Sequence, residues 1–408
     1  SKRSDFQEIN LPFSILVNPF SENIHFENKI PSINSENIND FRCHFCQAFL
    51  SNIKINHNDS CNYCDSLISD NKIVFMNKQK ENLQILLNNG TIDFVNSNHD
   101  FESKKNEFEH YLLVFDFSKT AIETECIQFL LNNIINVCKS LDRKTKLGIL
   151  LYDNEIYHLR SDYLDNNEIE CSICQIADLE NMETLSYKEI FFDVHSQESI
   201  VIAMVTFTLT LISKRKQTNV NKSDIFSIQE YLVNTFSLIF KELVGQVIII
   251  NSSPMFTNSN VLQDISISKS FIRQKAKIIN SIKDKINKLN IVINYLLPTN
   301  QEVEIEFFHE ISKLTNGKTY SYINYNNLLD SSVIYYLLLD LLTKPIYRNV
   351  SIKVRSSKDL IIKSISYQNC PISGDTIKLK SINKETHFLI NLNYARKILQ
   401  KNIFLQFE

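Results

Sequence analysis

CHFCQAFLSNIKINHNDSCNYC, residues 43–64, contains four of the nine cysteines in this chain of 408 residues. Cys43 and Cys46 form one C-x-x-C pair, Cys61 and Cys64 form a second, and fourteen residues separate the two pairs. Each pair can supply two ligands to a metal ion from a single turn of the chain, and the gap between the pairs is long enough for a short hairpin. Four thiolates complete a tetrahedron and leave no position for water or a substrate. The stretch therefore predicts a zinc ribbon that binds one Zn(II) ion for structure.

Two disulfides, or four unrelated core thiols, are the alternatives to a metal site. Disulfides require an oxidising compartment, and residues 1–10 show no apolar core or small-residue cleavage site of a secretory signal. His44 and His57 could replace a thiolate as ligands, but four thiolates already suffice. Cys171 and Cys174 form a further pair without a second pair at zinc spacing, and the apolar residues around them predict a strand.

Composition limits the class of protein. Hydrophobic residues make up 43% of the chain, which is long enough for two or three domains. The net charge of -3 argues against a nucleic acid as partner. The longest apolar run, residues 199–213, is shorter than the ~20 residues that cross a bilayer, so it predicts a buried helix in a soluble protein. The five glycines lie too far apart for a P-loop or a dinucleotide-binding motif.

Residues 68–344 have the pattern of an α/β domain. Short apolar segments without alternation are typical of strands that are buried on both faces. We expect strands at 111–115, 147–152, 246–251 and 291–297, and helices at 121–141, 199–213, 226–243, 268–289, 304–314 and 331–343. This alternation predicts a parallel or mixed sheet with helices on each side.

Short strands predominate at both ends of the chain, in residues 1–39 and 345–408. Each set alone is too small to bury a face of a sheet, so we expect the opening and closing strands to pair in a β-sandwich. The predicted fold class is therefore multidomain α/β plus β. Its parts are N-terminal sandwich strands in 1–39, a zinc finger in 40–67, the α/β trunk in 68–344 and the C-terminal part of the sandwich in 345–408.

A D-x-S-x-T turn, residues 116–120, follows the first trunk strand and is similar to the start of the metal-dependent adhesion site of von Willebrand factor A domains. Such a site also needs an aspartate after a later strand, but residues 251–254 are NSSP. We therefore expect Asp116 and Ser118 to accept hydrogen bonds from free amides at the start of the next helix. The chain has no G-x-S-x-G motif, and nothing in it predicts catalytic residues.

Short segments spread along the chain carry a family resemblance by their order. They are LPFSILVNPF (11–20), FRCHFCQAFL (41–50), SCNYC (60–64), NLQILLNNGTIDFV (82–95), YLLVFDFS (111–118), TKLGILLYD (145–153), GQVIIINSSP (245–254), LTNGKTYSY (314–322), IKVRSSKDL (352–360) and LQF (405–407). Together they resemble the inner-layer subunits of the COPII vesicle coat, and within them the cargo-binding adaptor. The resemblance covers nearly the whole chain and implies that the trunk is von Willebrand factor A-like.

This resemblance implies a protein that is not an enzyme. Such adaptors form a heterodimer with a sister subunit that stimulates the small coat GTPase, and so act on that GTPase indirectly. They are cytoplasmic and peripheral on the endoplasmic reticulum membrane and on COPII vesicles. They bind cytosolic export signals of cargo and SNARE proteins, and thereby select cargo for transport from the endoplasmic reticulum to the Golgi.

The resemblance also implies a cargo-binding pocket for acidic signals at Arg42, Lys353 and Arg355, because guanidinium and ammonium groups bind carboxylates. Gln47 stands where the family has a basic residue, so weaker or altered binding is expected. The alternative is that Arg42 and Arg355 are ordinary solvated charges. The family's helical and gelsolin-like domains are expected to be absent, since they would follow Glu408.

Two other functions remain as alternatives. The GTPase-activating sister subunit has the same fold, but the glycine and the Asp-Phe pair within residues 82–95 favour the adaptor. A metal-dependent adhesion module of the von Willebrand A type would use Asp116.

Overall fold

The computed structural model describes residues 13–18, 31–34, 42–50, 60–61, 63–67, 85, 93–95, 108–142, 144–163, 169–176, 190–215, 225–253, 265–300, 304–358, 360–367, 370–372, 376–394 and 405–407. The chain forms two compact units. The α/β unit is Asn106–Pro345, and the β unit combines Ser1–Lys105 with Ile346–Glu408. The ribbon therefore shares a unit with the two ends of the chain.

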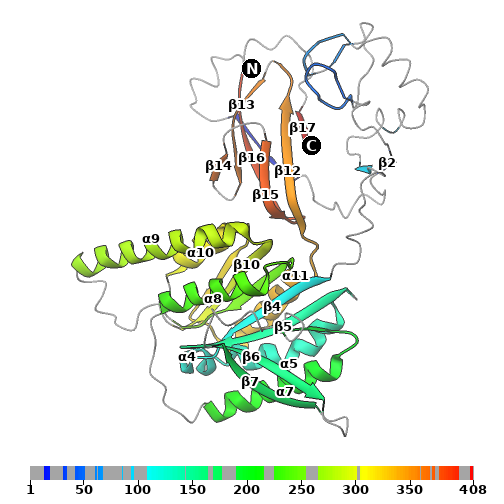
Figure 1. Cartoon of the computed structure of the whole chain (residues 1–408). Coiled ribbons are helices and arrows are strands. Elements are labelled where there is room, and N and C mark those ends of the chain that lie inside the picture. Colours follow the sequence, from blue (N-terminus) through cyan, green and yellow to red (C-terminus); the bar gives the residue numbers. More distant parts are fainter. Residues whose placement is uncertain are drawn as a thin grey trace. The chain divides into compact units, whose positions relative to one another are not determined.

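A mixed sheet with the strand order β11-β10-β9-β4-β5-β6-β7 forms the centre of the α/β unit (Figure 1). The parallel strands are β4 (Glu109–Asp116), β5 (Thr145–Tyr152), β9 (Gly245–Ile250), β10 (Ile291–Thr299) and β11 (Thr319–Ile323). The antiparallel strands are β6 (Ile156–Tyr163), β7 (Ile169–Ile176) and β8 (Phe191–Asp193), which pairs with β5. Every residue of β9 and β10 is buried, as expected for strands that are covered on both faces.

Helices cover both faces of this sheet. One core contains the apolar residues of α4 (Lys119–Glu123), α5 (Cys126–Lys139), α7 (Glu198–Arg215) and α11 (Asn327–Thr343). The other core contains those of α8 (Ile225–Ile239), α9 (Ile265–Lys288) and α10 (Ile305–Lys313). The predicted mixed sheet with helices on each side is confirmed. Among the described residues, none of the helices combines the length and the apolar character that crossing a membrane requires.

The helix that the sequence predicts at 121–141 is two helices, α4 and α5. Glu125 interrupts it with a φ of 60° in the left-handed region. The Thr124 hydroxyl donates to the carbonyl oxygen of Ala121, 2.7 Å away, and accepts from the amide of Cys126. The Thr124 side chain thus ends α4 and begins α5. Hydroxyl side chains often compete in this way with the backbone hydrogen bonds of a helix. The predicted strand around Cys171 is confirmed as β7.

Two sheets of the β unit enclose a common apolar core. The first has the order β1-β16-β13-β14, with β1 (Phe13–Val17), β16 (Phe388–Tyr394), β13 (Leu360–Tyr367) and β14 (Cys370–Ile372). The second has the order β15-β12-β17, with β15 (Thr376–Ile382), β12 (Tyr347–Ser356) and β17 (Leu405–Phe407). A separate pair joins β2 (Ser32–Asn34) to β3 (Asp93–Val95).

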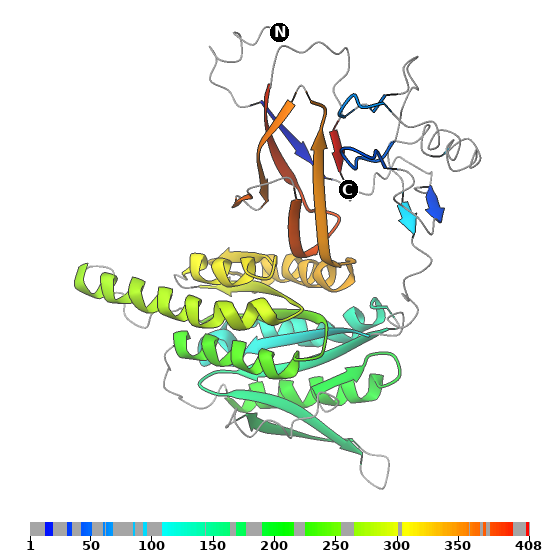
Figure 2. The same cartoon turned by 45° about the horizontal axis from the view of Figure 1, so that its top comes forward.

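Strand β1 pairs with β16 along its whole length, from Phe13 opposite Leu392 to Val17 opposite Phe388. Figure 2 shows this blue strand among the orange and red strands from the other end of the chain. The predicted pairing of opening and closing strands is therefore confirmed. The hairpin predicted between the cysteine pairs, His57, the boundary at residue 68 and most of the segment 82–92 lie outside the described residues.

Candidate metal centre and the basic residues beside it

The two cysteine pairs lie in knuckles with the same backbone hydrogen bonds. In the first, the Cys43 amide donates to the Ala48 carbonyl over 2.8 Å and the Gln47 amide to the Cys43 carbonyl over 3.0 Å. The second knuckle, from Cys61 to Ser66, repeats both bonds over 2.9 and 2.8 Å. Gln47 and Asp65 occupy equivalent positions, with φ values of 59° and 58°. Each knuckle therefore turns its two thiols toward the same point.

The four sulfur atoms lie close enough together to hold one metal ion. All lie within 4.8 Å of one another, and the Sγ atoms of Cys43 and Cys64, and of Cys46 and Cys61, are 3.7 Å apart. A Zn–S bond of about 2.3 Å places tetrahedral sulfurs roughly 3.8 Å apart. A disulfide needs about 2.05 Å, and all four thiols are free. The spacing fits one ion held by four thiolates, and none of these four cysteines forms a disulfide in the structure.

The protein around these thiols stabilises some of them as neutral groups. Burial raises the pKa of the Cys46 thiol to about 11, although a hydrogen bond with the Ala48 backbone acts in the opposite direction. Burial also raises the pKa of Cys61. For Cys64, burial acts to raise the pKa, but hydrogen bonds with the Ser66 side chain and backbone outweigh it and lower the pKa to about 7. A divalent ion would stabilise the thiolates in place of protons.

Side chains within the second sheet of the sandwich, and just after one of its strands, attach the two knuckles. The Phe49 amide donates to Gln406 Oε1 over 2.9 Å, and Gln406 Nε2 donates to the Phe49 carbonyl over 3.1 Å. Figure 2 shows the blue ribbon beside the red strand β17, which carries Gln406. Lys358, which follows β12, forms an ion pair with Asp65 of the second knuckle. The ribbon and the sandwich are therefore joined by polar contacts at each knuckle.

Arg42 and Arg355 bind consecutive carbonyl groups of the first knuckle. Arg42 Nη1 donates to the Gln47 carbonyl over 2.8 Å, and Arg355 Nη1 donates to the Cys46 carbonyl over 2.7 Å. The Arg42 guanidinium also lies over the Phe49 ring, 3.9 Å from its centroid, in the geometry of a cation–π contact. Both side chains are half-buried. Two arginines that are far apart in sequence thus meet at one turn.

Lys353 lies two residues before Arg355 on β12, so both side chains project from the same face of the sheet. Ile352 and Val354 project from the opposite face into the sandwich core. The structure therefore brings Arg42 and Arg355 to the same knuckle and places Lys353 in line with Arg355. No local sequence pattern identifies Gln406 and Lys358 as the residues that attach the ribbon, because their partners are distant in the chain.

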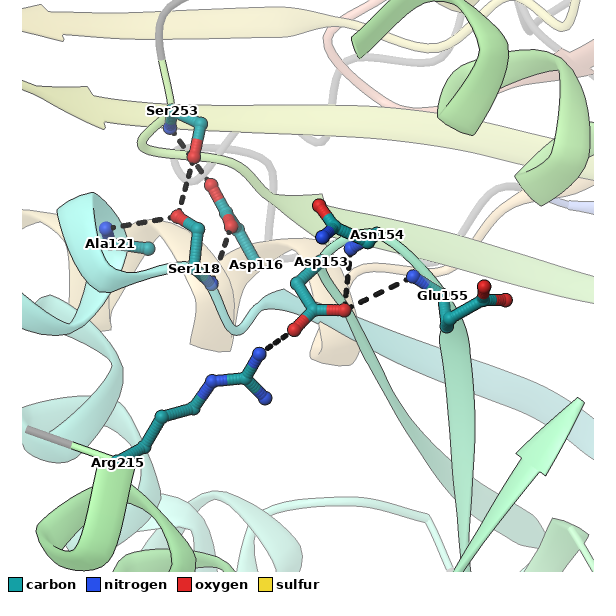
Figure 3. Close-up of polar contacts among 8 residues, drawn as sticks. All are labelled: Asp116, Ser118, Ala121, Asp153, Asn154, Glu155, Arg215 and Ser253. Atoms are coloured by element: carbon teal, nitrogen blue, oxygen red, sulfur yellow. Dashed lines mark hydrogen bonds and ion pairs between the residues drawn. The ribbon is translucent and has the colours of Figure 1, made fainter. Parts of the chain in front are cut away.

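The second candidate site lies at the C-terminal end of β4 (Figure 3). Asp116 is 1% exposed, and its carboxylate accepts hydrogen bonds from the amides of Ser118, Ser252 and Ser253 at 3.0, 3.1 and 2.8 Å. The Ser118 hydroxyl accepts from the Ala121 amide at the start of α4. The predicted capping role of Asp116 and Ser118 is confirmed, and the carboxylate also ties β4 to the loop that follows β9.

Arg215 supplies a positive charge near this carboxylate. Its guanidinium forms an ion pair with Asp153, whose side chain is 6% exposed (Figure 3). The same guanidinium lies 4.6 Å from the centroid of the Phe117 ring. Burial lowers the pKa of Arg215, while the nearby Asp116 acts to raise it. The acidic groups at this end of the sheet are thus balanced by backbone amides and by a protein cation, as in a structural network.

The described parts define a class: a protein with a four-cysteine ribbon attached to a sandwich of both chain ends, and a second unit built on a mixed sheet. No family model matches the chain. The crystal structure of the human COPII-coat protein Sec24c matches it with a TM-score of 0.69 and 12% identity, over 100% of this chain and 56% of that chain. The chain therefore has a Sec24-like fold.

A curated relative found by sequence comparison is also a SEC24 protein. The protein transport protein SEC24 of Pyricularia oryzae is 18% identical over 345 residues, which are 78% of this chain and 34% of that protein. A von Willebrand factor type A structure from Catenulispora acidiphila matches with a TM-score of 0.40 and 8% identity, over 70% of this chain and 58% of that chain. The chain thus spans about a third of the length of the curated relative and 56% of the Sec24c structure.

Proposed function

We propose that this chain is part of a COPII coat subunit of the Sec24 type, in the family of inner-layer coat subunits. The observation that carries the proposal is the match to the human COPII-coat protein Sec24c, because it extends over 100% of this chain and therefore includes both units and the ribbon. The four-cysteine cluster supports it as a structural Zn(II) site. A coat subunit of this kind acts by binding and is not an enzyme.

The proposed task is the selection of cargo for transport from the endoplasmic reticulum to the Golgi. Arg42, Lys353 and Arg355 would bind carboxylates in the cytosolic export signals of cargo and SNARE proteins. Each guanidinium carries five N–H donors in a planar arrangement that suits a carboxylate, and one of these donors binds a carbonyl group of the knuckle. The hydrogen bonds to the carbonyl groups orient the two guanidinium groups. Binding of a carboxylate would therefore cost less side-chain entropy.

The proposed partners follow from the same assignment. The chain would form a heterodimer with the GTPase-activating sister subunit and act on the small coat GTPase indirectly. It would be cytoplasmic and peripheral on the endoplasmic reticulum membrane and on COPII vesicles. Nucleic acid is not among its proposed partners.

Binding of a synthetic acidic peptide tests the cargo site. A fluorescein-labelled peptide with one Asp-Glu pair should bind wild-type protein, and the Arg42→Ala/Arg355→Ala variant should bind it about tenfold more weakly or worse. Arg273→Ala, at an exposed arginine of α9, is the matched control and should bind as the wild type does. Equal peptide affinity of the double variant and the wild type would refute the site, provided that both retain their zinc.

A pull-down distinguishes the adaptor from the sister subunit, which is the main alternative because it shares the fold. An adaptor should capture purified sister subunit and no GTPase by itself. Capture of the GTPase by this chain alone would instead assign it as the sister subunit.

A further inference from the structure

A row of basic side chains follows the outer face of the second sheet of the sandwich, β15-β12-β17. Side chains alternate along a strand, and the inward-facing residues are the core residues Ile352, Val354, Ile377 and Leu379. The outward-facing basic residues between them, which we call the cationic face, are Lys353, Arg355, Lys378 and Lys380. The three strands contain no aspartate or glutamate.

The register of the strands shows how the cationic face extends away from the first knuckle. Arg355 lies opposite Gln406, which attaches the first knuckle. Lys353 lies opposite Thr376, and Lys378 lies opposite Ser351. Lys353 and Lys378 are therefore diagonal neighbours across the two strands, close enough to act on the same ligand. Basic side chains thus follow one another from the proposed cargo site along β12 and β15.

Burial lowers the pKa of Lys380, which is half-buried on this face, whereas Lys378 is exposed. A negative ligand that approaches both lysines would favour their charged forms and gain binding free energy from each contact. The chain as a whole has a net charge of -3, so the positive sign of this face is local and does not reflect an overall basic protein. A local basic face of this kind favours a ligand with acidic groups at defined spacing.

The spacing along the strand sets the length of that ligand. Arg355 is four residues beyond Ser351, the partner of Lys378. At about 3.4 Å per residue, Arg355 and Lys378 are roughly 14 Å apart along the strand. An extended peptide has the same rise per residue, so acidic residues four positions apart would project on the same side and reach both cations.

We propose that Lys378 and Lys380 bind a second acidic position of the peptide whose first acidic position binds at Arg42 and Arg355. This proposal rests on the proposed cargo function and extends it, because the preferred ligand is an extended segment with two acidic positions about four residues apart. A peptide fits better than a lipid surface, because the row of charges has the repeat of an extended chain and begins at the oriented arginine pair.

Two fluorescein-labelled peptides of equal length test this. One has a single Asp-Glu pair, and the other has a second such pair about four residues further along. Wild-type protein should bind the second peptide more tightly. The Lys378→Gln/Lys380→Gln variant should lose about fivefold in affinity for the second peptide and keep its affinity for the first. Lys378→Gln alone should show part of the loss, because it removes only the exposed lysine.

The matched control is Lys363→Gln, at an exposed lysine of β13 in the other sheet, and it should bind both peptides as the wild type does. Equal binding of the second peptide by the wild type and the double lysine variant would overturn this proposal while leaving the arginine site intact. If wild-type protein binds neither peptide, the cargo function and this proposal fail together. Lysine-dependent binding to phosphatidylserine vesicles, without a preference for the second peptide, would also overturn it.

Discussion

Gln406 pairs with Phe49 as a neighbouring strand would, because its side-chain amide accepts from the Phe49 amide over 2.9 Å and donates to the Phe49 carbonyl over 3.1 Å. The two residues are 357 positions apart in the sequence. The Gln406 side chain thus helps to fix the first knuckle on the edge of the sandwich, together with Arg355 of β12, which binds the Cys46 carbonyl.

Replacement of Gln406 by alanine should loosen this attachment. The Phe49 amide would lose a partner worth about 1 kcal/mol net, so its hydrogen exchange should accelerate. Zinc content should not change, because no ligand is removed. Gln406→Glu keeps the acceptor and loses the donor, so it should have an intermediate effect. Gln175→Ala, at an exposed residue of β7, is the control, and unchanged exchange at Phe49 in the alanine variant would contradict the attachment.

The ribbon should contain one zinc ion per chain, measured by elemental mass spectrometry on folded protein. Structural zinc contributes roughly 10–16 kcal/mol of apparent folding free energy in small zinc modules, so Cys61→Ser should release the ion and unfold the ribbon. Cys174→Ser is the matched control, since Cys174 lies in β7 outside the cluster. Retention of full zinc content by Cys61→Ser would argue against a four-thiolate site.

Asp116 should matter for stability and not for cation binding. Asp116→Ala leaves three backbone amides without their acceptor, and each such donor costs about 1–3 kcal/mol if it remains buried and unpaired. We expect the free energy of unfolding of the α/β unit, measured with urea, to fall by about 3 kcal/mol or more. Asp162→Ala, at an exposed aspartate of β6, should have little effect.

Addition of Mg²⁺ separates this network from a metal-dependent adhesion site. Wild-type protein should show no saturable heat of Mg²⁺ binding in calorimetry, and the loss of stability in Asp116→Ala should be the same with and without Mg²⁺. Stabilisation of only the wild type by Mg²⁺ would show that Asp116 binds a cation.

Gly317 follows the end of α10, where Asn316 has a φ of 60° and the Gly317 amide donates to the Ser312 carbonyl over 2.9 Å. This is a Schellman end with asparagine in the left-handed position. A Cβ atom on Gly317 would lie 1.9 Å from the Ile293 carbonyl oxygen, so Gly317→Ala must shift the backbone and should cost roughly 1–3 kcal/mol.

Asn316→Gly, which suits the left-handed position, is the matched control and should leave stability unchanged or slightly raise it. Both variants can be compared by urea denaturation. Equal stability of Gly317→Ala and the wild type would show that α10 and β10 are not held as closely as this contact requires.

Several parts of the fold were predictable from sequence because their signals are local. The spacing of the four cysteines predicts a cluster that can hold a metal ion without reference to the rest of the chain, and uninterrupted apolar runs such as β9 predict buried strands. The break at Glu125 was missed, because the apolar pattern of the helix continues through it and the Thr124 hydroxyl ends the helix by a hydrogen bond that leaves that pattern unchanged. The capping roles of Asp116 and Ser118 were predictable from the turn itself.

The sequence by itself determined the four-cysteine cluster and the mixed α/β unit, since spacing and periodicity encode them, and the pairing of the two ends followed because neither set of strands is large enough to bury a face of a sheet. Tertiary structure alone decided that Arg355 binds the Cys46 carbonyl, 309 positions away, and that Arg215 pairs with Asp153. Contacts of this kind depend on strand register and on where separate segments meet. A shift of one residue in the register of β12 would turn Lys353 and Arg355 into the core. No short stretch of the sequence determines this register by itself.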